Sequence, residues 1–324
     1  MERVIDVIVS CSNRKKYPVR KGLSLRQVMS NDIAGRVHYW LSNLKKLSAP
    51  QHSPEQLYAG DHWSIVRTIA SQALNHRFRA RVWICSAGYG LVPYRAALKS
   101  YKATFARGHR DSVSLARSFK ACSVENQRWW DSLGSSWKGP VPGKPRRLCD
   151  IPRTCGKAPM LVALSSDYLA ATAKDLGKLI SDPYYRAHLH VISCGTQSPD
   201  ALLSPNLLPC DARMQRAVGG ARVSLNVRIA AYLLSQLKTG KEPHKIVREL
   251  CTNIERKPLS QTKRIRVTDF DVKNFIQVEC RKNPRLSRTT LLQSLRRKKM
   301  ACEQSRFARL YRATVSSLHR SSRA

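Results

Sequence analysis

The sequence between residues 4 and 10 is Val-Ile-Asp-Val-Ile-Val-Ser, and the residues that follow it are Cys11-Ser-Asn-Arg-Lys. β-Branched residues fill most of the first run. A short and nearly continuous apolar run is typical of a strand that is buried on both faces of a parallel sheet. The small polar and basic residues after Ser10 indicate that the chain leaves the sheet there. We therefore predict a buried strand at Val4–Ser10 whose carboxyl end is marked by Cys11.

Three further runs have the same character, at Val82–Ser86, Met160–Ser165 and Leu189–Cys194. Stretches of helical length and pattern lie between these runs. We expect the helices at Ala34–Leu47, Trp63–Phe78, Ser112–Leu133 and Tyr168–Ile180, with another at Ser224–Leu237 after the last strand. The alternation of strands and helices predicts an α/β fold, in which helices cover both faces of a mostly parallel sheet.

The domain organisation follows from changes in composition along the chain. We assign residues 1–240 to the α/β domain, with a Gly- and Pro-rich surface loop at about 135–159, and residues 241–266 to a basic linker. Residues 267–324 are expected to form a small helical unit. Its helices are predicted at Asp269–Cys280, Thr289–Arg297 and Glu303–Leu318, with a turn at Lys298–Cys302. This outline is typical of a helix-turn-helix or winged unit, which binds nucleic acid.

The charge balance indicates the kind of partner. The chain of 324 residues has 58 Lys and Arg against 21 Asp and Glu, a net charge of +37. Its apolar content of 42% is that of a folded protein, and no apolar run is long enough to span a bilayer. Solubility alone does not require such an excess of positive charge. We expect a nucleic acid as the partner, DNA rather than RNA, and no membrane.

The segment from Lys241 onward is more basic than the rest, with 22 Lys and Arg against 7 Asp and Glu. At helical spacing, the last helix has an apolar side and an arginine side. The residues that we expect to contact nucleic acid are Arg296, Arg297, Lys298, Lys299, Arg306, Arg309 and Arg312. An ordinary solvated face, packing on the main domain and a contact with a partner protein are the alternatives.

The ten cysteines and the absence of known cofactor motifs limit the chemistry. No Cys-x-x-Cys pair is present, so we expect no metal site. The N-terminal residues lack the layout of a signal peptide, and we expect a cytoplasmic protein with reduced thiols. Neither GxxxxGK[ST] nor a complete GxGxxG occurs. An ATPase or a dinucleotide-dependent enzyme is therefore not indicated, and we expect no cofactor.

Polar residues follow all four predicted strands, and ligands of open α/β sheets bind beyond the carboxyl ends of the strands. We therefore expect the four ends to line one cleft. Residues there that are expected to contact a substrate are Ser12, Lys15, Ser86, Gly88 and Gly90, with Asn226 at a helix start. The two glycines fit a tight turn that brings backbone N–H groups near a phosphate or a base.

Cys11 is the candidate nucleophile of this cleft. Basic residues directly after it, Arg14 to Lys16, favour the thiolate form of a neighbouring cysteine. The alternative is that Cys11 only packs beneath the loop while the basic residues face the solvent. His109 and Asp167 are the candidates for general acid or base.

Four motifs together resemble a family of proteins related to the peroxide-stress protein YaaA. They are Cys11-Ser-Asn-Arg-Lys-Lys16, Leu57-Tyr-Ala-Gly60, Ser86-Ala-Gly-Tyr-Gly-Leu-Val92 and Tyr101-Lys-Ala-Thr104. The first of them also resembles a segment of archaeosine synthase, which acts on a 7-cyano-7-deazaguanine base in tRNA. The resemblance covers about residues 4–105 well and 160–235 loosely, and it does not extend to the segment from Lys241 onward.

The resemblance implies a uracil-DNA-glycosylase-like α/β fold and a place among proteins that introduce 7-deazaguanines into bacterial DNA. It implies conversion of a 7-cyano base into the 7-amido base, in which a Cys11 thiolate attacks the nitrile. Tyr58, Tyr89, Tyr101, His109 or Asp167 would then donate the proton or stack on the base. Other proteins of such a modification cluster are further possible partners. The alternative function is a non-catalytic DNA-binding component of a modification or phage-defence system.

Overall fold

The computed structural model describes residues 3–75, 78–137, 139–194, 201–237, 241–252, 254, 265–283 and 286–321. The chain divides into two compact units, Met1–Lys257 and Pro258–Ala324. Each unit is considered by itself below.

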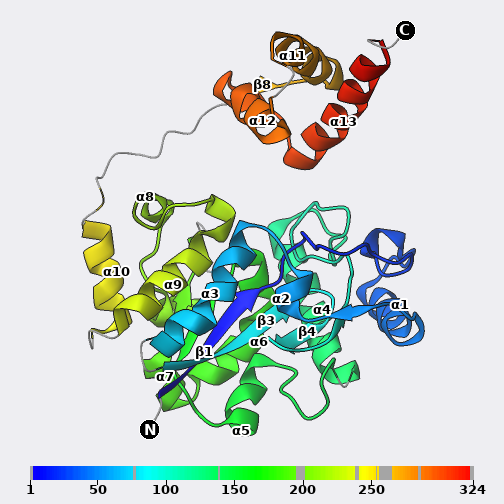
Figure 1. The fold of residues 1–324 in the computed structure, drawn as a ribbon. Helices are drawn as coiled ribbons and strands as arrows, with labels where there is room; N and C mark the ends of the chain where they lie inside the picture. Colours follow the sequence, from blue (N-terminus) through cyan, green and yellow to red (C-terminus); the bar gives the residue numbers. More distant parts are fainter. Residues whose placement is uncertain are drawn as a thin grey trace. The chain divides into compact units, whose positions relative to one another are not determined.

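The first unit is built on a five-stranded sheet with the strand order β4-β3-β1-β6-β7 (Figure 1). The strands are β1 (Arg3–Ser10), β3 (Phe78–Ser86), β4 (Gly90–Pro93), β6 (Met160–Ala163) and β7 (Leu189–Ile192). All neighbours are parallel except β4, which runs antiparallel to β3. The mostly parallel α/β fold predicted from the sequence is confirmed. The strands β6 and β7 end before the predicted Ser165 and Cys194.

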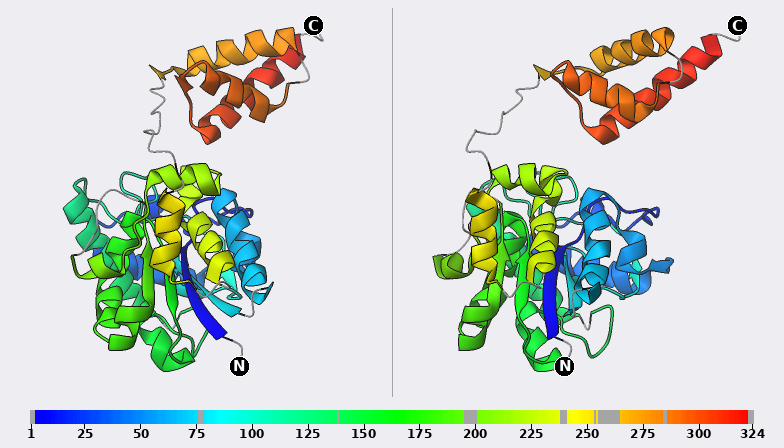
Figure 2. Two further views of the ribbon diagram at one scale, coloured as in Figure 1. Left: turned by 90° about the vertical axis from the view of Figure 1, so that its left-hand side faces the viewer. Right: turned by 60° about the vertical axis from the view of Figure 1, so that its left-hand side comes forward.

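Helices cover both faces of this sheet (Figure 2). On one face, α3 (Asp61–Asn75) packs against α9 (Leu225–Gln236). On the other face, α4 (Phe119–Ser136) packs against α6 (Ser166–Ile180), and α1 (Ile33–Lys46) packs against α4. The opposite placement of α3 and of α4 with α6 follows from the right-handedness of crossovers, because the crossover from β1 to β3 and the crossovers to β6 and β7 move in opposite directions along the sheet.

Among the helix boundaries that differ from the prediction, two change the assignment of a segment. The helix α4 begins at Phe119 rather than at Ser112, because the hydroxyl of Ser118 accepts a hydrogen bond from the Ala121 amide and caps the helix there. Ser112 instead pairs with Thr104 as an isolated bridge between loops. Phe78, predicted as the end of a helix, is the first residue of β3.

The remaining elements of the first unit are short. Two-residue strands β2 (Gln51–His52) and β5 (Leu98–Lys99) pair antiparallel. The short α-helices are α2 (Pro54–Leu57), α5 (Ile151–Cys155), α7 (Pro183–His188) and α8 (Gln215–Val218). The 3-10 turns are Leu25–Gln27, Leu148–Asp150, Ala201–Asn206, Ala212–Met214 and Arg222–Ser224. The predicted loop at 135–159 thus contains two helical turns.

The predicted linker at 241–266 is wrong in its first half. Residues Pro243–Thr252 form the helix α10, and Ile246, Val247 and Leu250 on it belong to the apolar core of the first unit. Their spacing places them on one side of a helix, and that burial outweighs the polar composition of the segment. The boundary between the units falls later, between Lys257 and Pro258.

The described residues of the second unit form three helices, α11 (Asp269–Lys282), α12 (Arg288–Arg297) and α13 (Gln304–Ser321). Short strands β8 (Ile265–Arg266) and β9 (Met300–Ala301) pair in parallel. Apolar residues from all three helices form a core of their own, with Val272, Phe275, Ile276, Leu291, Leu295, Phe307 and Leu310 among its members. The predicted small C-terminal helical unit is confirmed.

No helix within the described segments has the length and apolar character that a membrane crossing requires.

Candidate active site

The carboxyl ends of the parallel strands bring Cys11 and the first turn of α6 together. The Cys11 amide donates a hydrogen bond of 2.9 Å to the Cys85 carbonyl, so the residue continues the pairing of β1 with β3. Its side chain is buried, with 6% of the residue exposed. The Cys11 Sγ lies 3.1 Å from the Tyr168 hydroxyl oxygen. The thiol is therefore enclosed between the end of β1 and the helix that follows β6.

Lys15 points its amine into the same region. The Nζ atom is buried and has no hydrogen-bond partner among the described residues, whereas other parts of the residue remain partly exposed. It lies 4.0 Å from the ring centroid of Tyr101 and 5.5 Å from that of Tyr58. Burial lowers the pKa of Lys15 to about 8, although attraction to a Cys11 thiolate and to Asp111 acts in the opposite direction.

Three hydroxyl groups form a chain beside this amine. The Ser86 Oγ lies 2.7 Å from the Tyr101 hydroxyl oxygen, which lies 2.8 Å from the Tyr58 hydroxyl oxygen. Ser86 Oγ also accepts hydrogen bonds from the amides of Gly88 and Tyr89, so its own proton is left for Tyr101. Burial, reinforced by the neighbouring Cys11 thiolate, raises the pKa of Tyr58 and of Tyr101 well above the usual value. Both phenols therefore stay protonated at neutral pH.

These residues form one connected group at the ends of β1, β3 and β6. We call it the strand-end cluster and define it as Cys11, Lys15, Tyr58, Ser86, Tyr101 and Tyr168. The structure thus brings together five residues predicted from the sequence and adds Tyr168. The tyrosine was missed, although it follows directly on the predicted Asp167 at the start of a helix that leaves a strand end.

The predicted glycines shape the wall of the cluster. A side chain at Gly88 would meet the Tyr101 ring at 2.5 Å, and the Gly88 carbonyl accepts a hydrogen bond of 2.7 Å from the Trp40 indole. Gly90 has a φ of +74°, which favours glycine. Tyr89 directs its hydroxyl to the backbone of Lys99 and its ring to the edge of Tyr101. These residues pack around Tyr101 and hold its ring in place.

Two predicted residues support the fold around the cluster. The Ser12 hydroxyl donates to the Ala59 carbonyl at 3.0 Å, which joins the loop after β1 to the loop after α2. The Asn226 side chain donates to the Leu164 carbonyl at 2.7 Å and accepts from the Cys194 amide at 2.9 Å. Asn226 therefore ties together the ends of β6 and β7.

The two predicted acid–base residues lie outside the cluster. His109 is exposed, and its Nδ1 accepts a hydrogen bond of 3.0 Å from the Asp111 amide within a turn. Asp167 is half-buried at the start of α6, where burial raises its pKa and the nearby Arg107 opposes that shift. The structure shows no contact of either side chain with Cys11.

Sequence reasoning also missed two polar contacts that hold α3 in place. His62 donates a hydrogen bond of 3.0 Å from Nε2 to the Ser10 carbonyl, and burial lowers its pKa to about 4. Asp61 accepts hydrogen bonds from the Ser224 hydroxyl and from Arg228, which lower its pKa to about 2. The sequence alone does not distinguish a histidine and an aspartate that make such contacts from the same residues exposed to solvent at the start of a helix.

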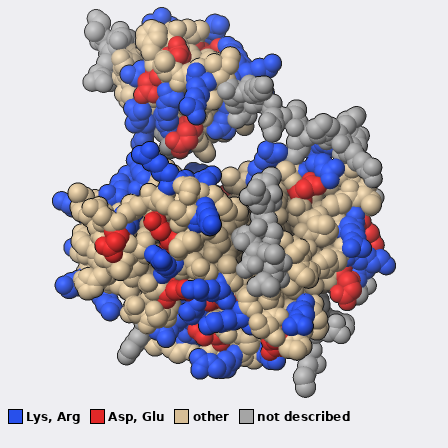
Figure 3. Space-filling view, turned by 180° about the vertical axis from the view of Figure 1, so that it is seen from behind, with Lys and Arg blue, Asp and Glu red and all other residues tan. Residues whose placement is uncertain are grey.

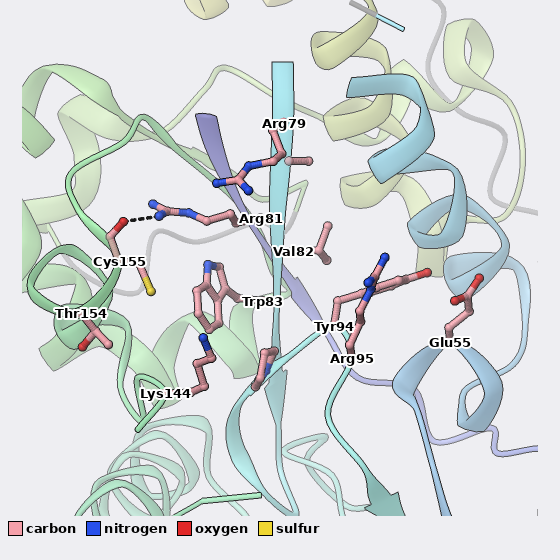
Figure 4. Close-up of a pocket in the computed structure, with 12 residues that line it drawn as sticks. Glu55, Arg79, Arg81, Val82, Trp83, Tyr94, Arg95, Lys144, Thr154 and Cys155 are labelled. Atoms are coloured by element: carbon pink, nitrogen blue, oxygen red, sulfur yellow. Dashed lines mark hydrogen bonds between the residues drawn. The ribbon is translucent and has the colours of Figure 1, made fainter. Parts of the chain in front are cut away.

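An open cleft at the strand ends was expected, and the aromatic side chains of the cluster fill this place instead. A cavity of about 840 Å³ lies at the opposite end of β3, around Arg79 and Trp83 (Figure 4). A second cavity of about 520 Å³ lies at the amino ends of β1 and β6. Neither cavity is lined by a residue of the cluster. The cluster, in contrast, holds a thiol and an amine in one region.

In the second unit, the predicted nucleic-acid contacts divide into two groups. Arg306 and Arg309 both pair with Asp269, at 2.6 Å and 3.0 Å, and Arg306 also donates to the Val267 carbonyl. Lys298 pairs with Glu279 at 3.2 Å, and Arg296 is partly buried.

By contrast, Arg297, Lys299 and Arg312 are exposed and pair with no acidic side chain of the described segments. Figure 3 shows one face of each unit, and Lys and Arg are more numerous on it than Asp and Glu.

The described residues contain no group of three or more His, Cys, Asp or Glu side chains placed to hold a metal ion. Comparisons of the chain with protein-family models, with curated proteins and with solved structures find no match.

Proposed function

We propose that the first unit is an enzyme that modifies a base in DNA, with Cys11 as the nucleophile. One observation carries the proposal: a buried thiol and a buried, unpartnered lysine amine lie at the same strand ends, among hydroxyl groups. A buried ammonium costs free energy unless it is paired and hydrogen-bonded. We assign the Lys15 amine the role of electrostatic partner of Cys11, because attraction between the two is one of the influences on the pKa of Lys15.

The substrate that fits both this chemistry and the sequence resemblance is a 7-cyano-7-deazaguanine base. The Cys11 sulfur attacks the nitrile carbon, and the nitrile nitrogen takes up a proton, which gives a thioimidate. Water then adds to the same carbon. Cleavage of the C–S bond releases the amide and the Cys11 thiolate, and the proton freed in this step returns to the Lys15 amine, so the net reaction is the addition of one water to the nitrile.

Lys15 is the proposed proton donor to the nitrile nitrogen. With a pKa of about 8, its amine is protonated at neutral pH and close to the value at which proton transfer is efficient. The rings of Tyr101 and Tyr58, which the hydroxyl chain from Ser86 holds in place, lie beside the Lys15 amine. Tyr168 covers the thiol, and its side chain has to turn away when a base enters.

The alternative is a non-catalytic DNA-binding component of a modification or defence system. The strand-end cluster is closed, because only 6% of Cys11 is exposed. A closed cluster favours this alternative. The unpartnered Lys15 amine disfavours it, because a binding scaffold gains nothing from an uncompensated buried charge.

Mass spectrometry of nucleosides tests the proposal. DNA from cells that contain the protein should hold the 7-amido base, whereas DNA from cells with the Cys11→Ser variant should hold the 7-cyano base instead. Cys122→Ser is the matched control, because Cys122 is also buried in the first unit and its thiol donates to the Ala116 carbonyl, which a serine hydroxyl can replace. Equal amounts of the amido base with the wild-type protein and with Cys11→Ser would exclude Cys11 as the nucleophile.

A further inference from the structure

The strand β3 is longer than its antiparallel neighbour. It runs from Phe78 to Ser86, but β4 pairs only with its last part, from Trp83 to Ser86. The final contact on this side is a hydrogen bond of 3.2 Å from the Tyr94 amide to the Val82 carbonyl. Before Val82, this edge of β3 has no neighbouring strand within the described part of the chain.

The direction of the backbone groups on this edge follows from two hydrogen bonds. The Cys85 carbonyl accepts from Cys11 and so points toward β1, whereas the Val82 carbonyl points away from β1, toward Tyr94. Backbone groups of successive strand residues point alternately to the two sides. The N–H and C=O of Ala80 and the N–H of Val82 therefore face the open edge.

The cavity of about 840 Å³ runs along this edge. Figure 4 shows β3 between two walls: Lys144, Thr154 and Cys155 lie on one side, and Tyr94, Arg95 and Glu55 on the other. The result is a groove with strand backbone at its floor and side chains along both walls.

The charge of the groove is positive. Arg79, Arg95 and Lys144 are exposed, and no ion pair joins any of them to the described acidic residues. Arg81 is neutralised, since its Nε and one terminal nitrogen bond the buried Asp6 carboxylate, each at 2.8 Å. Glu55 is the one acidic residue among those that line the groove.

We propose that this groove binds an extended, acidic peptide segment of a partner protein, which adds to the sheet as a strand beside β3. An exposed strand edge is a template for such addition. A peptide supplies both a donor for the Ala80 carbonyl and acceptors for the amides of Ala80 and Val82. A nucleic-acid backbone offers phosphate oxygens, which only accept, and would leave the carbonyl unsatisfied.

The open edge sets the length of the segment. Residues 78–82 accommodate about five residues of an added strand, at about 3.3 Å per residue. Side chains of an added strand alternate between the two walls. We therefore expect acidic residues in the bound segment, which pair with Arg79, Arg95 and Lys144.

The test selects binders from a display library of random eight-residue peptides on the full-length protein. The selected peptides should be acidic and should bind with reduced affinity to Ala80→Pro, which removes one edge N–H and leaves the pairing with β1 intact. N-methylation of every second peptide nitrogen should abolish binding when the methylated nitrogens face β3. It should leave binding intact when the methylated nitrogens are the ones that face away from β3.

The double variant Arg79→Glu with Arg95→Glu should weaken binding at least tenfold. Its matched control is Lys45→Glu with Lys46→Glu, two residues at the end of α1.

Hydrogen exchange provides a second measurement that does not depend on a variant. The amides of Ala80 and Val82 should exchange quickly in the free protein and at least tenfold more slowly with a selected peptide bound. Selection that yields no peptide sensitive to the Arg79 and Arg95 variant would overturn the proposal. So would protection of the same amides by a single-stranded oligonucleotide but by no peptide, which would assign the groove to nucleic acid.

Discussion

At the scale of single residues, the proposed function depends most on Lys15. Its Nζ atom is buried over the ring of Tyr101 and makes no hydrogen bond to the described residues. Contact with an aromatic face compensates a buried ammonium only in part. The chain therefore keeps a charge at this position at the expense of stability, which is common at sites that carry chemistry.

The first prediction is that Lys15→Met stabilises the protein while it abolishes base modification. Burial lowers the pKa of Lys15 from 10.5 to about 8, so the folded protein binds this proton less tightly than the unfolded chain. Below pH 8 the charged amine is a burden on the fold, and its removal should raise the free energy of unfolding by about 1–3 kcal/mol. Urea unfolding at pH 7 measures this change. Lys16→Met, at an exposed neighbour, is the control and should change little. A lower unfolding midpoint for Lys15→Met would assign the lysine a structural role.

The sequence predicted most residues of the strand-end cluster but not their arrangement. Cys11, Lys15 and Ser86 follow from strand ends, which depend on local patterns of apolar residues. His109 was expected beside them and instead caps a turn through the Asp111 amide. An interaction of that kind depends on the path of a loop, which no local pattern specifies. Tyr168 was missed because its contact with Cys11 joins residues 157 positions apart in the chain.

At the scale of elements, apolar patterns predicted the central strands and most helices, but not α10. The charged residues of Pro243–Thr252 suggested a linker, yet one face of the helix is buried. The strand β4 was also missed, because Gly90–Pro93 is too short for alternation to show. Its shortness leaves the edge of β3 open, so the structure was needed to find the groove proposed for a peptide.

The second prediction tests the assignment of α10 to the first unit. Val247 is fully buried, and an unpaired carboxylate at that position is expensive. Val247→Asp should lower the free energy of unfolding of the first unit by at least about 3 kcal/mol. Arg248→Asp changes an exposed residue of the same helix and serves as the control. Identical thermal unfolding of both variants and the wild type would mean that the segment behaves as a linker.

At the scale of the whole molecule, the two units suggest a division of labour. The first has the strand-end cluster, and the second has a separate core and exposed basic residues. The sequence indicated this division through composition and charge. It did not indicate which arginines remain available, because the pairing of Arg306 and Arg309 with Asp269 brings together two helices that are distant in the sequence.

The third prediction concerns those available residues. Replacement of Arg297, Lys299 and Arg312 by Ala in the full-length protein should weaken duplex binding. The slope of log affinity against log salt should fall by about 0.9 for each phosphate that the variant no longer neutralises. Salt titrations on one duplex measure it. Arg306→Ala is the comparison, and it should affect the stability of the second unit more than the slope. An unchanged slope for the triple variant would move DNA binding to the basic residues of the first unit.

The proposed function depends on a covalent bond between Cys11 and a nitrile on a DNA base. The most direct measurement is rapid-quench mass spectrometry of the protein with an oligonucleotide that contains one 7-cyano-7-deazaguanine. We predict a transient adduct that maps to Cys11, an oligonucleotide product that has gained the mass of one water, and loss of both with Cys11→Ser. Release of the same product by Cys11→Ser, or the absence of both adduct and product with the wild-type protein, would contradict the account.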